Sequence, residues 1–189
     1  ENSSIDGKGN HPVVHISWDD AQAYCEWAGK RLPTEAEFEY ASRGGVENTL
    51  YSWGNEPVDL GNLKANVWEG KFPTNNKIKD EYYYTAPVKS FKPNKYGLYD
   101  IAGNVWEWCF DWYHYNYYKM LENQVSDNPQ GPTNSFDPME PYSPKKVIRG
   151  GSFLCNDSYC SGFRNSMRMK STADSSSLHT GFRTVMNID

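Results

Sequence analysis

The part of the sequence that most limits the fold is residues 46–100, where regular helix and strand patterns fade. This stretch is rich in Gly, Asn, Pro and Tyr, and its apolar residues form short groups such as TAPVKSF and YGLYDIAG. Residues 123–146 hold five prolines, which predicts a surface loop. A chain with so much coil needs something besides backbone hydrogen-bond ladders to hold its loops together.

Two helices are predicted before the irregular stretch, each from a capping box. The first box is Ser17 with Asp20, and its helix ends before Gly29, where glycine suits the left-handed end of a helix. The second box is Thr34 with Glu37, and its helix ends at a pair of glycines. Both helices therefore have defined limits in the sequence itself.

Short strands are predicted in three apolar segments, whereas a fourth, aromatic segment fits neither helix nor strand. The predicted strands are HPVVHISW (11–18), KKVIRGGSF (145–153) and HTGFRTVMNI (179–188). In GNVWEWCFDWY (103–113), Trp106, Trp108 and Trp112 are most simply core residues. The expected architecture is one compact α+β domain over residues 1–189.

Composition excludes several classes of protein. A formal net charge of −5 and the absence of a basic stripe argue against a nucleic-acid binder. The 15% aromatic content is too high for a disordered chain. No window is long and apolar enough for a membrane span. Four cysteines are too few for a disulfide scaffold. The sequence also lacks the C-x-x-C pairs that are typical of zinc sites.

Oxygen-bearing side chains recur between residues 66 and 107. They are Asn66, Asp80, Asp100, Asn104 and Glu107. Calcium takes several such oxygens, which irregular loops supply easily. A bound cation would also explain how a long coil becomes rigid. The same residues are common in turns, and composition alone favours that plainer interpretation.

Cys155 and Cys160 lie five positions apart in RGGSFLCNDSYC. They fit three interpretations: a disulfide across a turn, two separate buried thiols, or a two-thiolate site for a soft cation, Cu(I) above all. Their spacing does not choose among the three.

An ordered set of segments resembles the formylglycine-generating enzyme (sulfatase-modifying factor) family. The segments are HPVVHISWDDAQAYCEWAGKRLPTEAEFEYASRGG, YSWGN, NVWEGKFP, APVKSF, NKYGLYDIAGNVWEW, RGGSFLCNDSYC and GFR, between about residues 11 and 186. The resemblance implies an irregular C-type-lectin-like α+β fold with little regular secondary structure. It also implies that a further N-terminal segment of the family is missing before the HPV block.

The resemblance implies calcium as well. One or two structural Ca²⁺ ions are expected in the loops before and around the W-E-W block. The first set of ligands would be Asn66, Asp80 and the carbonyls of Val67 and Tyr82. The second would be Asp100, Glu107 and the carbonyls of Gly103 and Val105.

The activity implied by the resemblance is oxidation of a cysteine in a C-x-P-x-R segment of an unfolded sulfatase to formylglycine, with dioxygen. Cys155 and Cys160 fall on the positions that bind Cu(I). Ser152 and Trp106 match residues that line the oxygen pocket, and Tyr159 adjoins the second ligand. Because relatives without the cysteine pair are not oxidases, the fold alone does not give the function.

Departures from the family pattern narrow the implied class further. Two disulfides of the secretory members would fall on Cys25 with Thr184 and on Ser42 with Asn165, so neither can form. That favours a bacterial member, cytoplasmic or extracytoplasmic, and predicts that Cys25 is a buried thiol. The alternatives are a related oxidase acting on another thiol and a non-catalytic, lectin-like binding or structural module.

Overall fold

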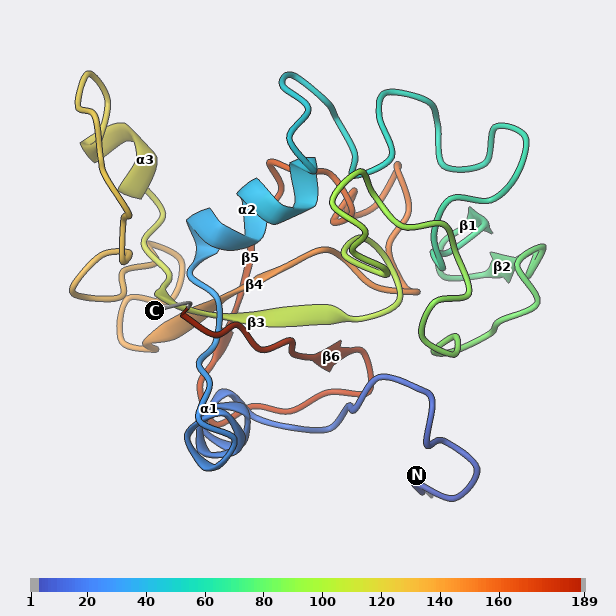
Figure 1. The fold of residues 1–189 in the computed structure, drawn as a ribbon, viewed down its shortest axis with the longest axis horizontal. Helices are drawn as coiled ribbons and strands as arrows, with labels where there is room; N and C mark the ends of the chain where they lie inside the picture. Colours follow the sequence, from blue (N-terminus) through green and yellow to red (C-terminus); the bar gives the residue numbers. More distant parts are fainter. Residues whose placement is uncertain (1–3, 188–189) are drawn as a thin grey trace.

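The computed structural model describes residues 4–187. Its helices and strands are α1 (Trp18–Trp27), α2 (Glu35–Arg43), β1 (Gly70–Lys71), β2 (Asn75–Asn76), β3 (Trp106–Trp112), α3 (Tyr117–Met120), β4 (Lys145–Arg149), β5 (Met169–Thr172) and β6 (Thr180–Gly181). Most of the remaining described chain is loop, as the fading sequence patterns predict (Figure 1).

Both predicted helices are confirmed, together with their capping boxes. The Ser17 side chain accepts a hydrogen bond from the Asp20 N–H, and the Asp20 side chain accepts one from the Ser17 N–H. Thr34 and Glu37 exchange the same pair of bonds at the start of α2. Gly44 ends α2 in the left-handed conformation, with φ at 58°, which glycine adopts without strain.

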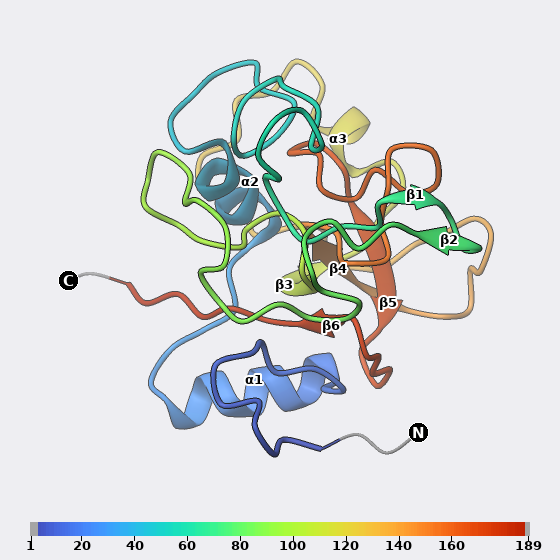
Figure 2. The same ribbon diagram turned by 90° about the vertical axis from the view of Figure 1, so that its right-hand side faces the viewer.

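A four-stranded sheet with the order β5-β4-β3-β6 forms the centre of the fold. β3 pairs antiparallel with β4 and parallel with β6, and β4 pairs antiparallel with β5. The sheet lies between α1 on one side and α2 on the other (Figures 1 and 2). The small hairpin of β1 and β2 lies at the end of the molecule away from α3 (Figure 1).

The strand predictions have mixed outcomes. KKVIR is β4. In HTGFRTVMNI, the described residues 179–187 form only the two-residue β6 and a single bridge between Arg31 and Val185, and residue 188 lies outside the described residues. The strand predicted over HPVVHISW is wrong, because His15 has a left-handed φ of 58° and that interrupts an extended ladder. The aromatic segment contains β3, which had no clear pattern because both of its faces are largely buried.

The sheet buries charges as well as aromatic rings. Trp106 and Trp108 belong to the main core, as predicted, while Trp112 is half-buried. All five residues of β4 are buried, including Lys146 and Arg149. Lys146 Nζ lies 3.8 Å from the ring centres of both Trp18 and Trp112. These two rings offset part of the loss of water at Lys146.

None of the helices in residues 4–187 has the length and apolar character needed to cross a bilayer.

Candidate active site and its loops

A tight turn brings the two cysteines of the C-terminal motif together. The Cα atoms of Cys155 and Cys160 are 5.3 Å apart, and their sulfurs are joined as a disulfide. Asn156 organises this turn: its Oδ1 accepts from the Tyr159 N–H at 2.8 Å, and its carbonyl accepts from the Cys160 N–H at 3.2 Å. Of the three interpretations of the pair, two separate buried thiols is therefore wrong.

The turn is also tied to the loop that precedes β1. Asn156 Nδ2 donates to the Gly70 carbonyl at 3.0 Å, and the Trp68 N–H donates to the Cys155 carbonyl at 2.9 Å. These bonds cross between segments far apart in the sequence, so the position of the sulfurs does not depend on the sheet alone.

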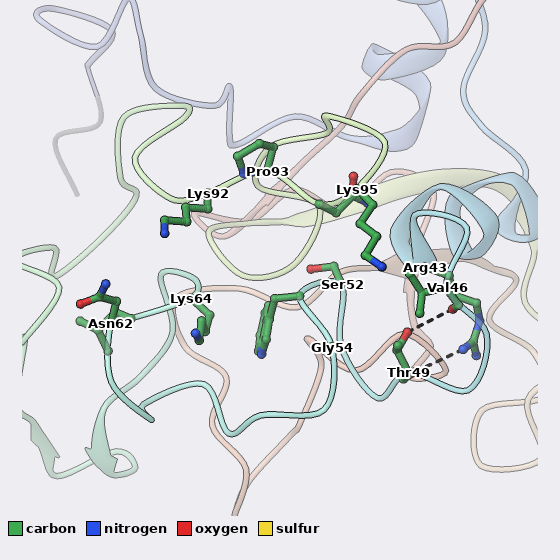
Figure 3. A pocket seen from close by; sticks show the side chains of 13 residues that line it. Arg43, Val46, Thr49, Ser52, Gly54, Asn62, Lys64, Lys92, Pro93 and Lys95 are labelled. Carbon is green, nitrogen blue, oxygen red and sulfur yellow. Dashed lines mark hydrogen bonds between the residues drawn. The ribbon is translucent and has the colours of Figure 1, made fainter.

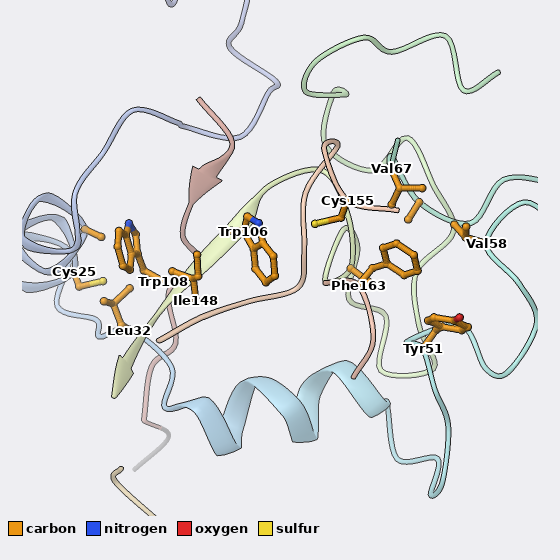
Figure 4. Close-up of a cluster of buried hydrophobic side chains, with 13 residues drawn as sticks. Cys25, Leu32, Tyr51, Val58, Val67, Trp106, Trp108, Ile148, Cys155 and Phe163 are labelled. Atoms are coloured by element: carbon orange, nitrogen blue, oxygen red, sulfur yellow. The ribbon is translucent and has the colours of Figure 1, made fainter. Parts of the chain in front are cut away.

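Ser152 and Trp106 lie beside the first cysteine. Ser152 is fully buried, and its Oγ is 4.0 Å from Cys155 Sγ. Trp106 is 4% exposed and belongs to the same buried cluster as Cys155 (Figure 4). The site therefore has one polar neighbour, the Ser152 hydroxyl, and one apolar neighbour, the Trp106 ring.

Two glycines permit close contacts between the chain segments that surround Trp106 and the cysteine turn. A Cβ on Gly162 would lie 2.5 Å from the Trp106 ring, and one on Gly151 would lie 2.6 Å from the Phe163 nitrogen. Gly151 also has a φ of 75°. A larger residue at position 162 would clash with the Trp106 ring, and one at position 151 would clash with the backbone of the segment that follows Cys160.

Tyr159 stands at the rim of the site. It is 66% exposed, and its ring stacks on Phe72 with the ring centres 4.2 Å apart. Phe72 in turn meets Trp68 edge to face at 5.2 Å. The structure thus brings together Cys155, Cys160, Ser152, Trp106 and Tyr159 around one turn.

Sequence reasoning missed the residues that position the turn, above all Asn156 and Gly162. Asn156 follows Cys155 directly, and its signal in the sequence is the N-D-S composition typical of a side-chain-capped turn. Gly162 gave no signal, because a close approach between distant segments leaves no local pattern.

The first predicted calcium set contains buried oxygens that have no hydrogen-bond partner in the part of the chain that the structure describes. Asn66 is 1% exposed; its Nδ2 donates to the Tyr84 carbonyl at 2.8 Å, while its Oδ1 has no hydrogen-bond partner. Asp80 Oδ2 and the neighbouring Glu69 Oε1 also have none. Burial raises the pKa of Asp80 to about 6, and the charge of Glu69 adds to the rise. Such oxygens are costly unless a cation binds them.

The second predicted calcium set has a different environment. Both oxygens of Glu107 accept hydrogen bonds from Arg183. Asp100 Oδ2 accepts from the Lys89 N–H at 2.7 Å, and burial raises the Asp100 pKa. Gly103 has a φ of 78°, and Val105 is buried. An internal cation thus already neutralises Glu107, and calcium at this set stays a prediction.

Among residues 4–187, no group of three or more His, Cys, Asp or Glu side chains has the geometry of a metal site. The first calcium set lies outside that description, because it combines one carboxylate with an amide and two backbone carbonyls. The cysteine pair lies outside it as well, since only two side chains are involved.

Two departures from the family disulfides have structural outcomes. Ser42 Oγ donates to Asn165 Oδ1 at 2.7 Å, and both residues are buried. A hydrogen bond thus joins the two positions where the resemblance would put a bridge. Cys25 is a free, fully buried thiol on α1, as predicted. Cys109 is likewise free and fully buried, and burial raises the pKa of both thiols.

The chain is similar to named proteins over nearly its whole length. The chain is 50% identical over 187 residues to the formylglycine-generating enzyme of Streptomyces coelicolor, and 49% identical over 181 residues to that of Thermomonospora curvata. The matches cover 99% and 96% of this chain but only 56% and 57% of the relatives, so the chain spans little more than half their length. An "Inactive C-alpha-formylglycine-generating enzyme 2" of Bos taurus is 40% identical over 184 residues, which are 96% of this chain and 52% of that protein.

The fold is also found among solved structures. Treponema denticola variable protein 1 superposes with a TM-score of 0.68 over 93% of this chain and 70% of its own, at 24% identity. At that identity the likeness shows the fold alone. A profile described as "Sulfatase-modifying factor enzyme 1-like domain" matches residues 1–188. The chain therefore belongs to the family of sulfatase-modifying factor enzyme 1-like domains.

Proposed function

We propose that residues 1–189 form a single domain that carries the catalytic centre of a formylglycine-generating enzyme. The reaction converts a cysteine in a C-x-P-x-R segment of an unfolded sulfatase into formylglycine, with dioxygen as the oxidant. The observation that carries the proposal is the meeting of Cys155 and Cys160 beside the buried Ser152 hydroxyl and the Trp106 ring. Two relatives that are 49% and 50% identical to this chain over the aligned residues bear that name.

The donor set at the turn suits Cu(I), because two thiolates held close together are soft ligands. An added thiol reductant, itself oxidised to a disulfide, must first supply two electrons and two protons to this disulfide, which releases the Cys155 and Cys160 thiols as the two ligands. Bound copper would supply the reaction with dioxygen that amino-acid side chains cannot perform.

The surrounding residues have separate tasks in this proposal. Ser152 holds a hydroxyl 4.0 Å from Cys155 Sγ, where it can donate a proton or a hydrogen bond to a group that reacts beside the sulfur. Trp106 is buried and keeps water from that side of the sulfurs. Tyr159 and Phe72 form a stacked pair at the rim, against which the substrate chain can lie.

We also propose that Ca²⁺ binds the first calcium set. Asn66 and Asp80 each have a buried oxygen without a partner, which is the observation that supports this. Glu69 adds a third such oxygen next to Asp80. Calcium there would tie together the coil from residue 66 to residue 84, the same loop that contacts the cysteine turn through Trp68 and Gly70.

The function is tested by incubating the reduced protein with Cu(I), oxygen and a synthetic peptide that contains C-x-P-x-R. We expect mass spectrometry to show loss of sulfur and gain of an aldehyde at the cysteine. Cys155→Ala and Cys160→Ala should lose both Cu(I) binding and conversion. Cys25→Ala, which removes a buried thiol elsewhere, should keep both.

Ser152→Ala separates chemistry from metal binding, since it should still bind Cu(I) but turn over more slowly. If the native protein binds Cu(I) and the peptide stays unchanged, the related oxidase acting on another thiol becomes the better interpretation. If the native protein binds no Cu(I), the proposal fails and the non-catalytic module replaces it.

A further inference from the structure

A pocket lined by cations lies on the face formed by three loops. Its cavity volume is about 460 Å³. Its charged lining residues are Arg43, Lys64, Lys92 and Lys95, and none of the Asp and Glu residues between positions 4 and 187 lines it. We call it the basic pocket. This is unusual for a chain with a formal net charge of −5, so the local charge runs against that of the whole protein.

Two of the four cations have no carboxylate partner. Arg43 pairs with Glu39 at 2.7 Å, and Lys64 pairs with Glu56 at 3.0 Å. Within residues 4–187, neither Lys92 nor Lys95 forms an ion pair. Both extend from one loop, and Ser52 and Lys64 face them from the other side of the opening (Figure 3). The basic pocket therefore presents two free positive charges to an incoming group.

A pair of stacked aromatic rings connects the basic pocket to the cysteine turn. Trp53 lines the pocket and stacks on Tyr51, with ring centres 4.8 Å apart and planes 11° apart. The Tyr51 hydroxyl donates to Asp157 Oδ1 at 3.4 Å, and Asp157 lies between the two cysteines. Leu63 lines the basic pocket together with a second hollow, whose wall includes Asn156, Asp157 and Ser158.

We propose that the basic pocket binds an acidic stretch of the substrate polypeptide, at a distance along the chain from the cysteine that reacts at Cys155 and Cys160. The inference rests on the proposed function and names a property of its substrate. A path from the turn through the second hollow and across Leu63 to the pocket suits an extended peptide. A free inorganic anion would need only the lysines, not the connection to the turn or the Trp53 ring.

The charge distribution gives the path a direction. The second hollow is lined by Lys77 and Lys79 but also by Asp59, Glu69 and Asp157, so it has no strong preference for either charge. The charged residues that line the basic pocket are all cations. Acidic residues next to the reacting cysteine would gain little, and acidic residues farther along the chain would gain most.

The test compares three peptides with the same C-x-P-x-R core: the bare core, the core followed by a spacer and a run of glutamates, and the core preceded by them. With the native protein, we expect one glutamate extension to lower KM. In the double variant Lys92→Gln/Lys95→Gln that KM should rise about three- to thirtyfold, the range expected for losing two exposed ion pairs. kcat, and KM for the bare core, should stay unchanged.

A matched control removes the same charge elsewhere. Lys30→Gln/Lys119→Gln changes two exposed lysines outside the pocket and should keep the preference for the extended peptide. Raising the salt concentration should weaken that preference in the native protein, because ions screen exposed charges. Inorganic phosphate is included as a competitor, and competition that is equally strong in the native protein and in the double variant argues against the pocket.

Binding is measured separately from turnover, so that failure of the inference and failure of the function are distinguishable. Labelled peptides with serine in place of the reacting cysteine are titrated by fluorescence anisotropy. Conversion of the bare core tests the function alone. If both glutamate extensions bind no more tightly than the bare core, or if the Lys92/Lys95 variant keeps the native preference, the inference is wrong, whether or not any peptide is oxidised.

Discussion

Asp111 is a buried carboxyl group in β3, and replacing it with asparagine gives a sharp test of how charge is placed in this fold. Asp111 is 3% exposed, and burial raises its pKa from 3.8 to about 6, with the charge of Glu35 adding to the rise. Its Oδ2 accepts a 2.7 Å hydrogen bond from the Glu35 N–H. In Asp111→Asn the amide oxygen can still accept that bond, while the buried negative charge disappears.

The magnitude follows from the pKa. The folded protein binds the Asp111 proton more tightly than the unfolded chain does, so the native protein loses stability as pH rises from about 4 to about 6. At about 1.36 kcal/mol for each pKa unit, the full loss is about 3 kcal/mol, and about 2 kcal/mol of it falls between pH 4 and pH 6. The asparagine variant has no such loss. The free energy of unfolding of Asp111→Asn minus that of the native protein should therefore rise by about 2 kcal/mol over this range.

The assay is urea unfolding of both proteins between pH 4 and 6.5. Only the pH dependence of the difference is interpreted, because a constant steric cost cancels; the Gly131 backbone packs closely against Asp111 Oδ1. The pH range stops at 6.5 so that Lys146 does not titrate within it. Burial lowers the pKa of Lys146 to about 8, although the negative charge of Asp111 acts to raise it. Asp127→Asn, at an exposed site, serves as the control. A difference that stays flat or falls with pH would refute the reasoning.

Three further outcomes are expected. Adding Ca²⁺ should raise the Tm of the native protein but not of Asp80→Asn, because Asp80 has a buried oxygen without a partner; equal shifts in a thermal melt would contradict the calcium proposal. Ser42→Ala should cost about 1–3 kcal/mol, measured by urea unfolding, because it leaves Asn165 Oδ1 buried without its donor. Gly162→Ala should cost about 1–3 kcal/mol and weaken Cu(I) binding, since its Cβ would meet the Trp106 ring at 2.5 Å; unchanged Cu(I) affinity would show that this crossing does not position the sulfurs.

The helices were predictable because their signals are local. Ser17 and Thr34 each begin a helix whose capping partner lies three residues later, so a short window contains all the necessary information. β3 was not predictable in the same way. Its residues are largely buried on both faces, and a strand of that kind lacks the alternation of polar and apolar residues that identifies a half-exposed strand.

The same difference between local and distant signals separates the parts of the candidate site that were predicted from those that were not. The cysteine pair and Ser152 were named from one short motif whose residues stay together in the fold. The basic pocket was not named, because Arg43, Lys64 and the loop with Lys92 and Lys95 are separated by about twenty residues or more along the chain. No local pattern marks cations that meet only after folding.

The position of the cysteine turn depends on close backbone crossings more than on regular secondary structure. β4 ends at Arg149, and the chain then passes so close to Phe163 that a Cβ at position 151 would lie 2.6 Å from the Phe163 nitrogen. Trp106, at the start of β3, fills the space against Gly162 on the same crossing. A shift of the sheet would therefore move the two sulfurs and the Trp106 ring together. In a domain with so much loop, these crossings hold Cys155 and Ser152 in the buried interior while Tyr159 stays exposed at the rim.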